Sequence, residues 1–266
     1  MPELPEVETI KRDLEKAVLD KKIVEVRIYN PMVIRQINPE KFRKELAGVK
    51  IKNVRRKAKV LVIGLSSGKF LVIHLKMTGQ LVYPGDAKNS RVSFLLSDGK
   101  TLDFNDQRLF GELRILDDWR SLKFIQRLGP EPFDLSQDDF KEMLSRKKTK
   151  IKSLLMDQTF ISGIGNLYAA ESLFGARIHP ERVASSLSDK EKEALLGAIK
   201  NVLSSAITYG GSSVDNYVRL SGKPGDYVRH HKVYGREGKL CLVCSGPIKK
   251  MMLGGRGTYF CPRCQK

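Results

Sequence analysis

The chain has 266 residues, with 48 lysines and arginines against 30 aspartates and glutamates, a formal net charge of +18. This length allows one large domain or two smaller ones, and a hydrophobic content of 41% excludes wholesale disorder. The longest apolar run, Val60–Leu65, is far shorter than the ~20 residues of a membrane span, and the N-terminus lacks a secretion signal pattern, so we expect a cytoplasmic protein.

The first half of the chain predicts one helix followed by strands. Leu4-Pro5-Glu6 places a proline and a carboxylate in a first helical turn, and apolar residues then recur at helical spacing to Val18. Ser66-Ser67-Gly68 and Ser97-Asp98-Gly99 are typical of hairpin turns. β-Branched and aromatic runs predict strands at Ile23–Tyr29, Lys59–Leu65, Phe70–Leu75, Val92–Leu96, Thr101–Phe104 and Leu113–Leu116. We therefore expect a β-sandwich or barrel with flanking helices.

Leu128–Pro132, rich in glycine and proline, is the expected boundary between this region and a helical one. Helices are predicted at Asp138–Ser145 (capped by Ser136), Ile151–Met156, Asn166–Phe174 and Asp189–Thr208. The last segments are short and rich in glycine and cysteine. The sequence thus predicts an α+β chain with an N-terminal domain at 1–130, a helical domain at 131–232 and a small module at 233–266.

The positive charge is spread over both halves, with +10 in residues 1–130 and +8 in residues 131–266. It is concentrated at Lys50–Lys59, at Lys141–Lys152 and after residue 233. Solvated faces or a membrane-surface patch are alternatives, but no amphipathic helix pairs a basic face with Trp and Phe. Nucleic acid, held by several elements, is therefore the expected partner.

All four cysteines lie near the end of the chain, in two C-x₂-C pairs separated by 16 residues: Cys241, Cys244, Cys261 and Cys264. Each pair can present two thiolates toward one tetrahedral metal ion. Two redox pairs or disulfides are the alternatives, but neither suits a reducing compartment or so small a module. We expect one structural Zn²⁺. Gly254–Gly257 forms a hairpin tip, where Arg256 could reach a phosphate or remain solvated.

Pro2 and Glu3 are candidate catalytic residues. Removal of Met1 would expose a secondary amine that titrates near pH 8, so a useful fraction is unprotonated at neutral pH. Its attack on a sugar C1′ gives an iminium that acts as an electron sink, and Glu3 could shuttle protons. The alternative is that Pro2, Glu3 and Glu6 only start a helix, and while Met1 is attached the Pro2 nitrogen is an inert amide.

Segments at the start, middle and end of the chain together resemble one family. The start of the chain, MPELPEVET, resembles the start of bacterial formamidopyrimidine-DNA glycosylases. The helix–two-turns–helix motif of that family resembles KSLLMDQTFISGIGNLYAAESLFGARIHP. Its zinc-finger β-hairpin resembles VYGREGKLCLVC together with GGRGTYFCPRC. The related endonuclease VIII branch typically has Gly in place of Leu4. The resemblance implies a monomeric, bacterial, nucleoid-associated base-excision repair enzyme without a nucleotide cofactor. It would remove oxidised purines (8-oxoguanine, formamidopyrimidines) from damaged double-stranded DNA and then cleave the strand as a lyase.

The resemblance also implies a role for each matching residue. Pro2 corresponds to the nucleophile that forms a Schiff base, Glu3 to the acid/base, Glu6 to a supporting carboxylate, and Lys59 to a lysine that binds phosphate near the lesion. The iminium acidifies the C2′ proton, so β,δ-elimination cuts the strand on both sides of the damaged site.

Three further residues match those that fill the space left by an extruded base: Met77, Arg108 and Phe110. The sequence without the resemblance favours core packing for Met77 and Phe110. Arg108 should prefer cytosine opposite the lesion. Leu109 replaces a second basic residue of many relatives, which would weaken the backbone grip nearby.

Lys152, Asn166 and Arg256 match phosphate or lesion contacts, and Asn166 follows two glycines at a helix start, where backbone N–H groups favour an anion. Tyr168 could assist them or be a buried helix aromatic. Val218–Tyr227 matches a flexible loop that closes over the extruded base. The four histidines have no convincing ligand spacing with the cysteines, and we interpret them as structural or close to phosphate.

Two other functions compete with this one. A zinc-containing DNA-binding protein could keep the fold without catalysis, but it would have no use for Pro2, Glu3 and Lys59. An enzyme of the endonuclease VIII type would instead release oxidised pyrimidines faster than 8-oxoguanine.

Overall fold

The computed structural model describes all 266 residues and divides the chain into two compact units. The first comprises residues 1–126 and 207–228, and the second comprises residues 127–206 and 229–266. This division differs from three consecutive domains at 1–130, 131–232 and 233–266, because the segment after the last long helix packs with the N-terminal unit. That three-domain organisation therefore stays a prediction.

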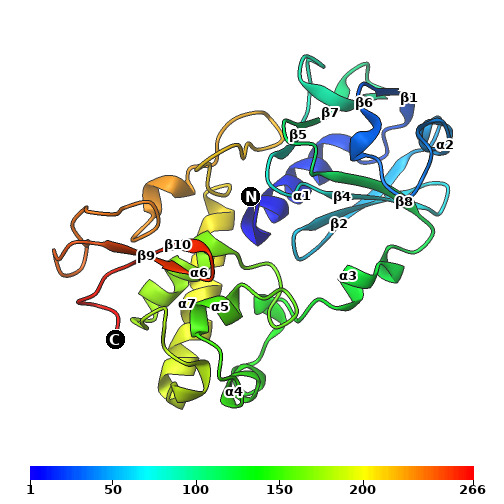
Figure 1. Cartoon of the computed structure of the whole chain (residues 1–266). Helices are drawn as coiled ribbons and strands as arrows, with labels where there is room; N and C mark the ends of the chain where they lie inside the picture. Colours follow the sequence, from blue (N-terminus) through cyan, green and yellow to red (C-terminus); the bar gives the residue numbers. More distant parts are fainter. The chain divides into compact units, whose positions relative to one another are not determined.

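The first unit contains two antiparallel four-stranded sheets, with strand orders β2-β3-β4-β8 and β1-β6-β7-β5 (Figure 1). Its strands are β1 (Ile23–Ile28), β2 (Ile51–Lys57), β3 (Val60–Leu65), β4 (Phe70–His74), β5 (Gly79–Val82), β6 (Ser90–Leu96), β7 (Thr101–Asp106) and β8 (Glu112–Leu116). Its helices are α1 (Leu4–Val18), α2 (Pro39–Leu46) and α3 (Lys123–Gln126), with short 3-10 turns η1 (Pro31–Val33) and η2 (Trp119–Ser121).

One hydrophobic core joins both sheets to α1. Ile10 and Leu14 of α1 pack in the same buried cluster as Leu61 of β3, Phe94 of β6 and Phe104 of β7. β3 is buried along its whole length, as its continuous apolar sequence predicts. The predicted α+β class, with an N-terminal β-sandwich and flanking helices, is confirmed.

Both predicted hairpin turns are present. Gly68 (φ +83°) closes the β3–β4 turn and Gly99 (φ +78°) closes the β6–β7 turn. Glycine adopts this left-handed backbone without the strain that a Cβ would add.

The sequence interpretation missed four helices and strands of this unit, namely α2, α3, β2 and β5. β2 lies within the basic segment Lys50–Lys59, and of the strand's own residues only Ile51 and Val54 are buried. An irregularity in pairing between Ile51 and Asn53 disrupts the alternation that identifies a strand. The lysines and arginines of β2 therefore hid its two core positions.

The second unit is helical and ends in a two-stranded hairpin. Its elements are η3 (Pro132–Asp134), α4 (Gln137–Ser145), α5 (Ile151–Leu155), α6 (Asn166–Gly175), η4 (Ala184–Ser186), α7 (Asp189–Thr208), η5 (Tyr227–His230), β9 (Lys249–Leu253) and β10 (Arg256–Phe260), of which α7 and η5 continue across the unit boundary. Ser136 caps α4 as predicted, since its Oγ accepts the Asp139 N–H at 3.1 Å. None of the helices combines the length and hydropathy needed to cross a bilayer.

Candidate functional site

The start of α1 is held by the carboxylate of Glu6. The Glu3 N–H donates to Glu6 Oε2 at 2.8 Å, which forms a capping box, and the Ser212 N–H donates to Glu6 Oε1 at 2.9 Å. Pro2 and Glu3 are both buried. Gly211 (φ +81°) allows the Ser212 bond to Glu6, because the Cβ of any other residue at 211 would crowd Glu6 Oε1 at 3.0 Å. One carboxylate therefore fixes Pro2 and Glu3 against the segment that follows α7.

An ion pair on the next turn of α1 holds the turn that carries Lys59. Arg56 Nε donates to Glu8 Oε2 at 2.9 Å, and Arg56 Nη1 donates to the Ala58 carbonyl at 2.9 Å. Burial opposes ionisation of Glu8, but its bonds to Arg56 and Arg12 prevail and lower the pKa of Glu8. Lys59 itself is buried. Sequence reasoning missed the Arg56–Glu8 pair because its members are 48 positions apart.

Met77, Arg108 and Phe110 form one exposed cluster. Arg108 Nη1 lies 3.5 Å from Met77 Sδ, and the Arg108 guanidinium stacks 4.6 Å from the centre of the Phe110 ring. Met77 is 44% exposed and Phe110 is 49% exposed, so the core packing that their residue types favoured is wrong. The cluster offers an apolar wedge, a planar cation and an aromatic ring to a partner.

Asp106, which the sequence analysis did not single out, organises this cluster. Its buried carboxylate accepts the N–H groups of Arg108 at 3.2 Å and Gly111 at 2.6 Å, and it accepts the Thr78 hydroxyl. Leu109 between them has φ +57° and packs against the core. The carboxylate thus holds the loop after β7 against Thr78, the neighbour of Met77.

Lys152 and Asn166 meet beside the hairpin tip. Lys152 is 1% exposed, and its Nζ donates to Asn166 Oδ1 at 2.6 Å. Asn166 Nδ2 donates to the Gly257 carbonyl at 3.1 Å, directly after Arg256, which is exposed. Gly254 lies against Ser153 of α5, with 3.7 Å between the Ser153 Oγ and the position of a Cβ. Lys152 and Asn166 therefore contact each other, and Asn166 contacts the backbone directly after Arg256.

Tyr168 is fully buried within α6, which is the second of its two expected placements. His74 is half-buried at the end of β4, and its Nδ1 accepts the Lys76 N–H at 3.0 Å. Burial, with the nearby Lys76 charge, lowers the pKa of His74 to about 3. His74 is therefore a neutral structural group.

The segment Val218–Tyr227 is tied to the first unit along its length. Arg219 Nη2 lies 3.1 Å from Asp13 Oδ1, and the Tyr83 N–H donates to the Leu220 carbonyl at 2.7 Å. The Gly225 N–H donates to Ser213 Oγ at 2.9 Å. A side-chain ion pair to α1 and a backbone bond just after β5 hold the start of this segment, and Ser213 holds its other end.

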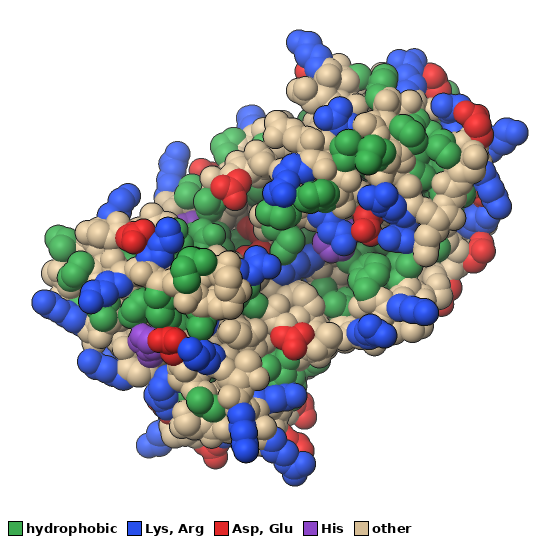
Figure 2. Space-filling model, in the orientation of Figure 1, with side chains coloured by type: hydrophobic (Ala, Val, Ile, Leu, Met, Phe, Trp, Pro, Cys, Tyr) green, Lys and Arg blue, Asp and Glu red, His purple; other side chains and the backbone are tan.

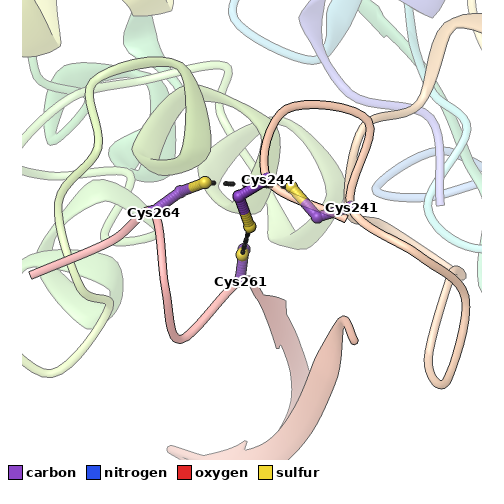
Figure 3. Close-up of side chains that lie close together, drawn as sticks. All are labelled: Cys241, Cys244, Cys261 and Cys264. Carbon is purple, nitrogen blue, oxygen red and sulfur yellow. Dashed lines mark hydrogen bonds between the residues drawn. The ribbon is translucent and has the colours of Figure 1, made fainter. Parts of the chain in front are cut away.

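The four cysteine sulfurs point toward one another from two turns (Figure 3). All four lie within 4.8 Å of one another, and two pairs are separated by 3.8 Å (Cys241–Cys264) and 3.4 Å (Cys244–Cys261). Tetrahedral Zn²⁺ with bonds of ~2.3 Å requires sulfur separations of about 3.8 Å. The thiols are free of disulfides, so the donor set fits one zinc ion.

Three family models match consecutive parts of the chain. They are the formamidopyrimidine-DNA glycosylase N-terminal domain at residues 1–113, the formamidopyrimidine-DNA glycosylase H2TH domain at 128–218, and a zinc finger found in FPG and IleRS at 238–266. The last match, with the four sulfurs, confirms the predicted single structural zinc ion.

Similar proteins cover the whole length. The chain is 42% identical to the formamidopyrimidine-DNA glycosylases of Pelotomaculum thermopropionicum and Solibacter usitatus, covering 100% of this chain and at least 99% of theirs. The crystal structure of MutM (Fpg) from Thermus thermophilus matches with a TM-score of 0.89 at 38% identity, covering 99% of this chain and 98% of that one. Lactococcus lactis Fpg in complex with DNA containing an abasic site matches with a TM-score of 0.91 at 33% identity, covering 99% of each chain.

Proposed function

The chain belongs to the formamidopyrimidine-DNA glycosylase family and is therefore an enzyme, and from this premise we propose that it excises oxidised purines from damaged double-stranded DNA. The substrates would be 8-oxoguanine and formamidopyrimidines, followed by cleavage of the strand as a DNA-(apurinic or apyrimidinic site) lyase. A Lactococcus lactis relative with 34% identity has been solved with DNA that contains Fapy-dG, which supports this substrate class.

The observation that carries the proposal is the placement of Pro2. The Glu6 carboxylate receives N–H groups from Glu3 and from Ser212, so the chain end is fixed. Once Met1 is removed, the Pro2 nitrogen is a secondary amine and a nucleophile. A helix start alone would not need the second bond of Glu6 to a segment 206 positions away.

The proposed reaction begins when the Pro2 nitrogen forms a bond to C1′ and the glycosidic bond breaks, so that the base leaves with that electron pair and gains a proton. Glu3 donates a proton to O4′ as the sugar ring opens, which leaves an iminium between Pro2 and C1′. Loss of the C2′ proton expels the 3′ phosphate, and a second elimination expels the 5′ phosphate. The zinc ion takes no part in these steps, because its four cysteine ligands leave no open position.

Met77, Arg108 and Phe110 would fill the duplex after base extrusion. An apolar wedge between bases offsets part of the unstacking free energy, which is a few kcal/mol. The exposure of Met77 and Phe110 and the stacking of Arg108 on the Phe110 ring support this role. The Arg108 donors suit the acceptors of an orphaned cytosine.

Lys59, Lys152, Asn166 and Arg256 would hold the phosphate backbone. Asn166 joins the buried Lys152 ammonium to the carbonyl after Arg256, so these three groups would act at one phosphate. Lysine and arginine side chains are scattered over the visible surface of both units (Figure 2). We further propose that the enzyme acts as a monomer without a nucleotide cofactor and works at the bacterial nucleoid, where its substrate lies.

Borohydride trapping tests the proposal. The protein, processed to begin at Pro2, is incubated with a duplex that carries 8-oxoguanine opposite cytosine, and the imine is reduced to a stable covalent complex. We expect wild-type protein to be trapped and Pro2→Gly to lose at least 100-fold in trapping. Pro39→Gly is the matched control, because Pro39 also begins a helix in the same unit and should retain trapping.

Two results would favour the competing functions. Tight binding of the lesion duplex without any trapping by wild-type protein would indicate a DNA-binding protein without catalysis. Faster release of oxidised pyrimidines than of 8-oxoguanine would indicate the endonuclease VIII type.

A further inference from the structure

The zinc finger carries the most exposed large hydrophobic side chains of the chain. They are Met252 (68% exposed), Leu240 (63%), Val243 (62%) and Leu242 (61%). Single exposed apolar residues are common on protein surfaces, whereas a cluster marks a site of interaction. Leu240, Leu242 and Val243 lie within four consecutive positions at one turn and are all more than 60% exposed, and we call them the knuckle patch.

The knuckle patch is displayed on a rigid turn. The Cys241 N–H donates to the Gly246 carbonyl at 2.8 Å, the Ser245 N–H donates to the Cys241 carbonyl at 3.0 Å, and Leu240 pairs with Pro247 in an isolated bridge. Zinc ligation by Cys241 and Cys244 fixes the same turn. A partner would therefore meet a preorganised surface, which lowers the entropy lost on binding.

Cations border the knuckle patch. Residues 233–266 contain seven lysines and arginines against one acid, Glu237, which pairs with Lys250 at 3.5 Å. Arg236 Nη2 donates to the Leu240 carbonyl at 3.0 Å, and the neighbouring Lys239 is exposed. Arg263 lies against Gly246 of the same turn, since a Cβ added there would be 2.7 Å from Arg263 Cδ. In Figure 2, hydrophobic side chains lie among lysines and arginines in the part of the view where Figure 1 draws the finger. An apolar centre with a cationic rim fits an apolar segment that carries acidic groups.

The knuckle patch lies at the opposite end of the hairpin from Arg256. The β9–β10 pairing runs from Lys249↔Phe260, next to the cysteine turns, to Leu253↔Arg256 at the tip. The four residue steps from Lys249 to Leu253 separate these ends by roughly 13 Å at ~3.3 Å per residue. A protein segment on the patch therefore leaves the hairpin tip free for a phosphate.

We propose that the knuckle patch is the docking site for an acidic segment of a partner protein, which inserts two or three large apolar side chains between the bordering cations. Such a segment would recruit the enzyme through its zinc finger without using its DNA contacts.

Fluorescence anisotropy tests this proposal with the zinc-loaded full-length protein. The probe is a fluorescein-labelled dodecapeptide that alternates Asp or Glu with Leu or Phe, and a version with Lys in place of each acid is the charge control. We expect saturable binding of the acidic peptide and none of the basic one. Leu242→Ser/Val243→Ser should weaken binding at least tenfold, and Leu240→Ser should weaken it independently. Met252→Ser, equally exposed in the same finger, should have no effect.

Zinc content of one ion per chain shows that each variant retains the finger, and trapping on lesion DNA should equal wild type in all of them. Loss of trapping or of duplex binding in Leu242→Ser/Val243→Ser would overturn the proposal, because the patch would then belong to the DNA surface. Absence of peptide binding to wild type would also overturn it. So would a wild-type dimer in sedimentation that this double variant converts to monomer, since the occupant would be a second copy of the chain.

Discussion

Replacing Asn166 with alanine is the sharpest structural test of the proposed phosphate site. Asn166 Oδ1 accepts from the Lys152 ammonium at 2.6 Å, and Asn166 Nδ2 donates to the Gly257 carbonyl at 3.1 Å. Asn166→Ala removes both bonds. Because Lys152 is only 1% exposed, water cannot readily replace the lost acceptor.

The expected loss of stability follows from the two bonds. A hydrogen bond to a charged group contributes about 1.5–3 kcal/mol, and a neutral one contributes about 0.5–1.5 kcal/mol. Asn166→Ala should therefore lower the free energy of unfolding of the helical unit by about 2–4 kcal/mol. Urea denaturation followed by far-UV circular dichroism, which reports mainly α4 to α7 because they hold most of the helical residues, measures this loss.

Asn201→Ala is the matched control, since Asn201 is exposed on α7 of the same unit and should change stability by less than about 0.5 kcal/mol. A double-mutant cycle with Lys152→Met isolates the Lys152–Asn166 bond, and we expect a coupling free energy above about 1 kcal/mol. A loss in Asn166→Ala no larger than that in Asn201→Ala would refute the proposed junction.

Three further outcomes are expected. Removal of zinc by a chelator, or Cys261→Ser, should unfold the finger and abolish binding to lesion DNA, as measured by gel shift and zinc content; unchanged binding would refute a structural zinc ion. The pKa of His74 falls to about 3 in the folded chain, so the unfolded state binds the extra proton between about pH 6.5 and pH 3. Stability should therefore be lost as pH falls through this window by up to about 1.4 kcal/mol per pH unit, and His74→Gln should flatten that slope in urea denaturation. Arg256→Ala should reduce the slope of log K against log salt for duplex binding by about 1, and an unchanged slope would show that Arg256 makes no phosphate contact.

Local sequence patterns could predict α1, the hairpin turns and the zinc ligands, because neighbouring residues determine each of these. The spacing of two C-x₂-C pairs alone indicates a metal site. The packing of the 207–228 segment with the N-terminal unit could not be predicted in this way. It involves the Ser212–Glu6 and Arg219–Asp13 bonds, whose partners are 206 positions apart.

The exposed cluster of Met77 and Phe110 shows a different limit. Large apolar residues in strand-rich sequence are usually core, and only the bonds of Asp106 to Arg108, Gly111 and Thr78 turn these loops outward. Residue type therefore favoured a buried environment for Met77 and Phe110, which is wrong, whereas the resemblance to the family implied exposed side chains that contact DNA. The Arg56–Glu8 pair beside Lys59 had no local signal at all.

Peptide mapping of the borohydride-trapped complex tests the central proposal most directly. After nuclease and trypsin digestion, mass spectrometry identifies the residue that carries the reduced sugar remnant. We expect the added mass on the N-terminal peptide Pro2–Lys11, with fragmentation that places it on Pro2 and with no Met1 in that peptide. A remnant on Lys59 or another lysine would contradict the proposed Pro2 chemistry.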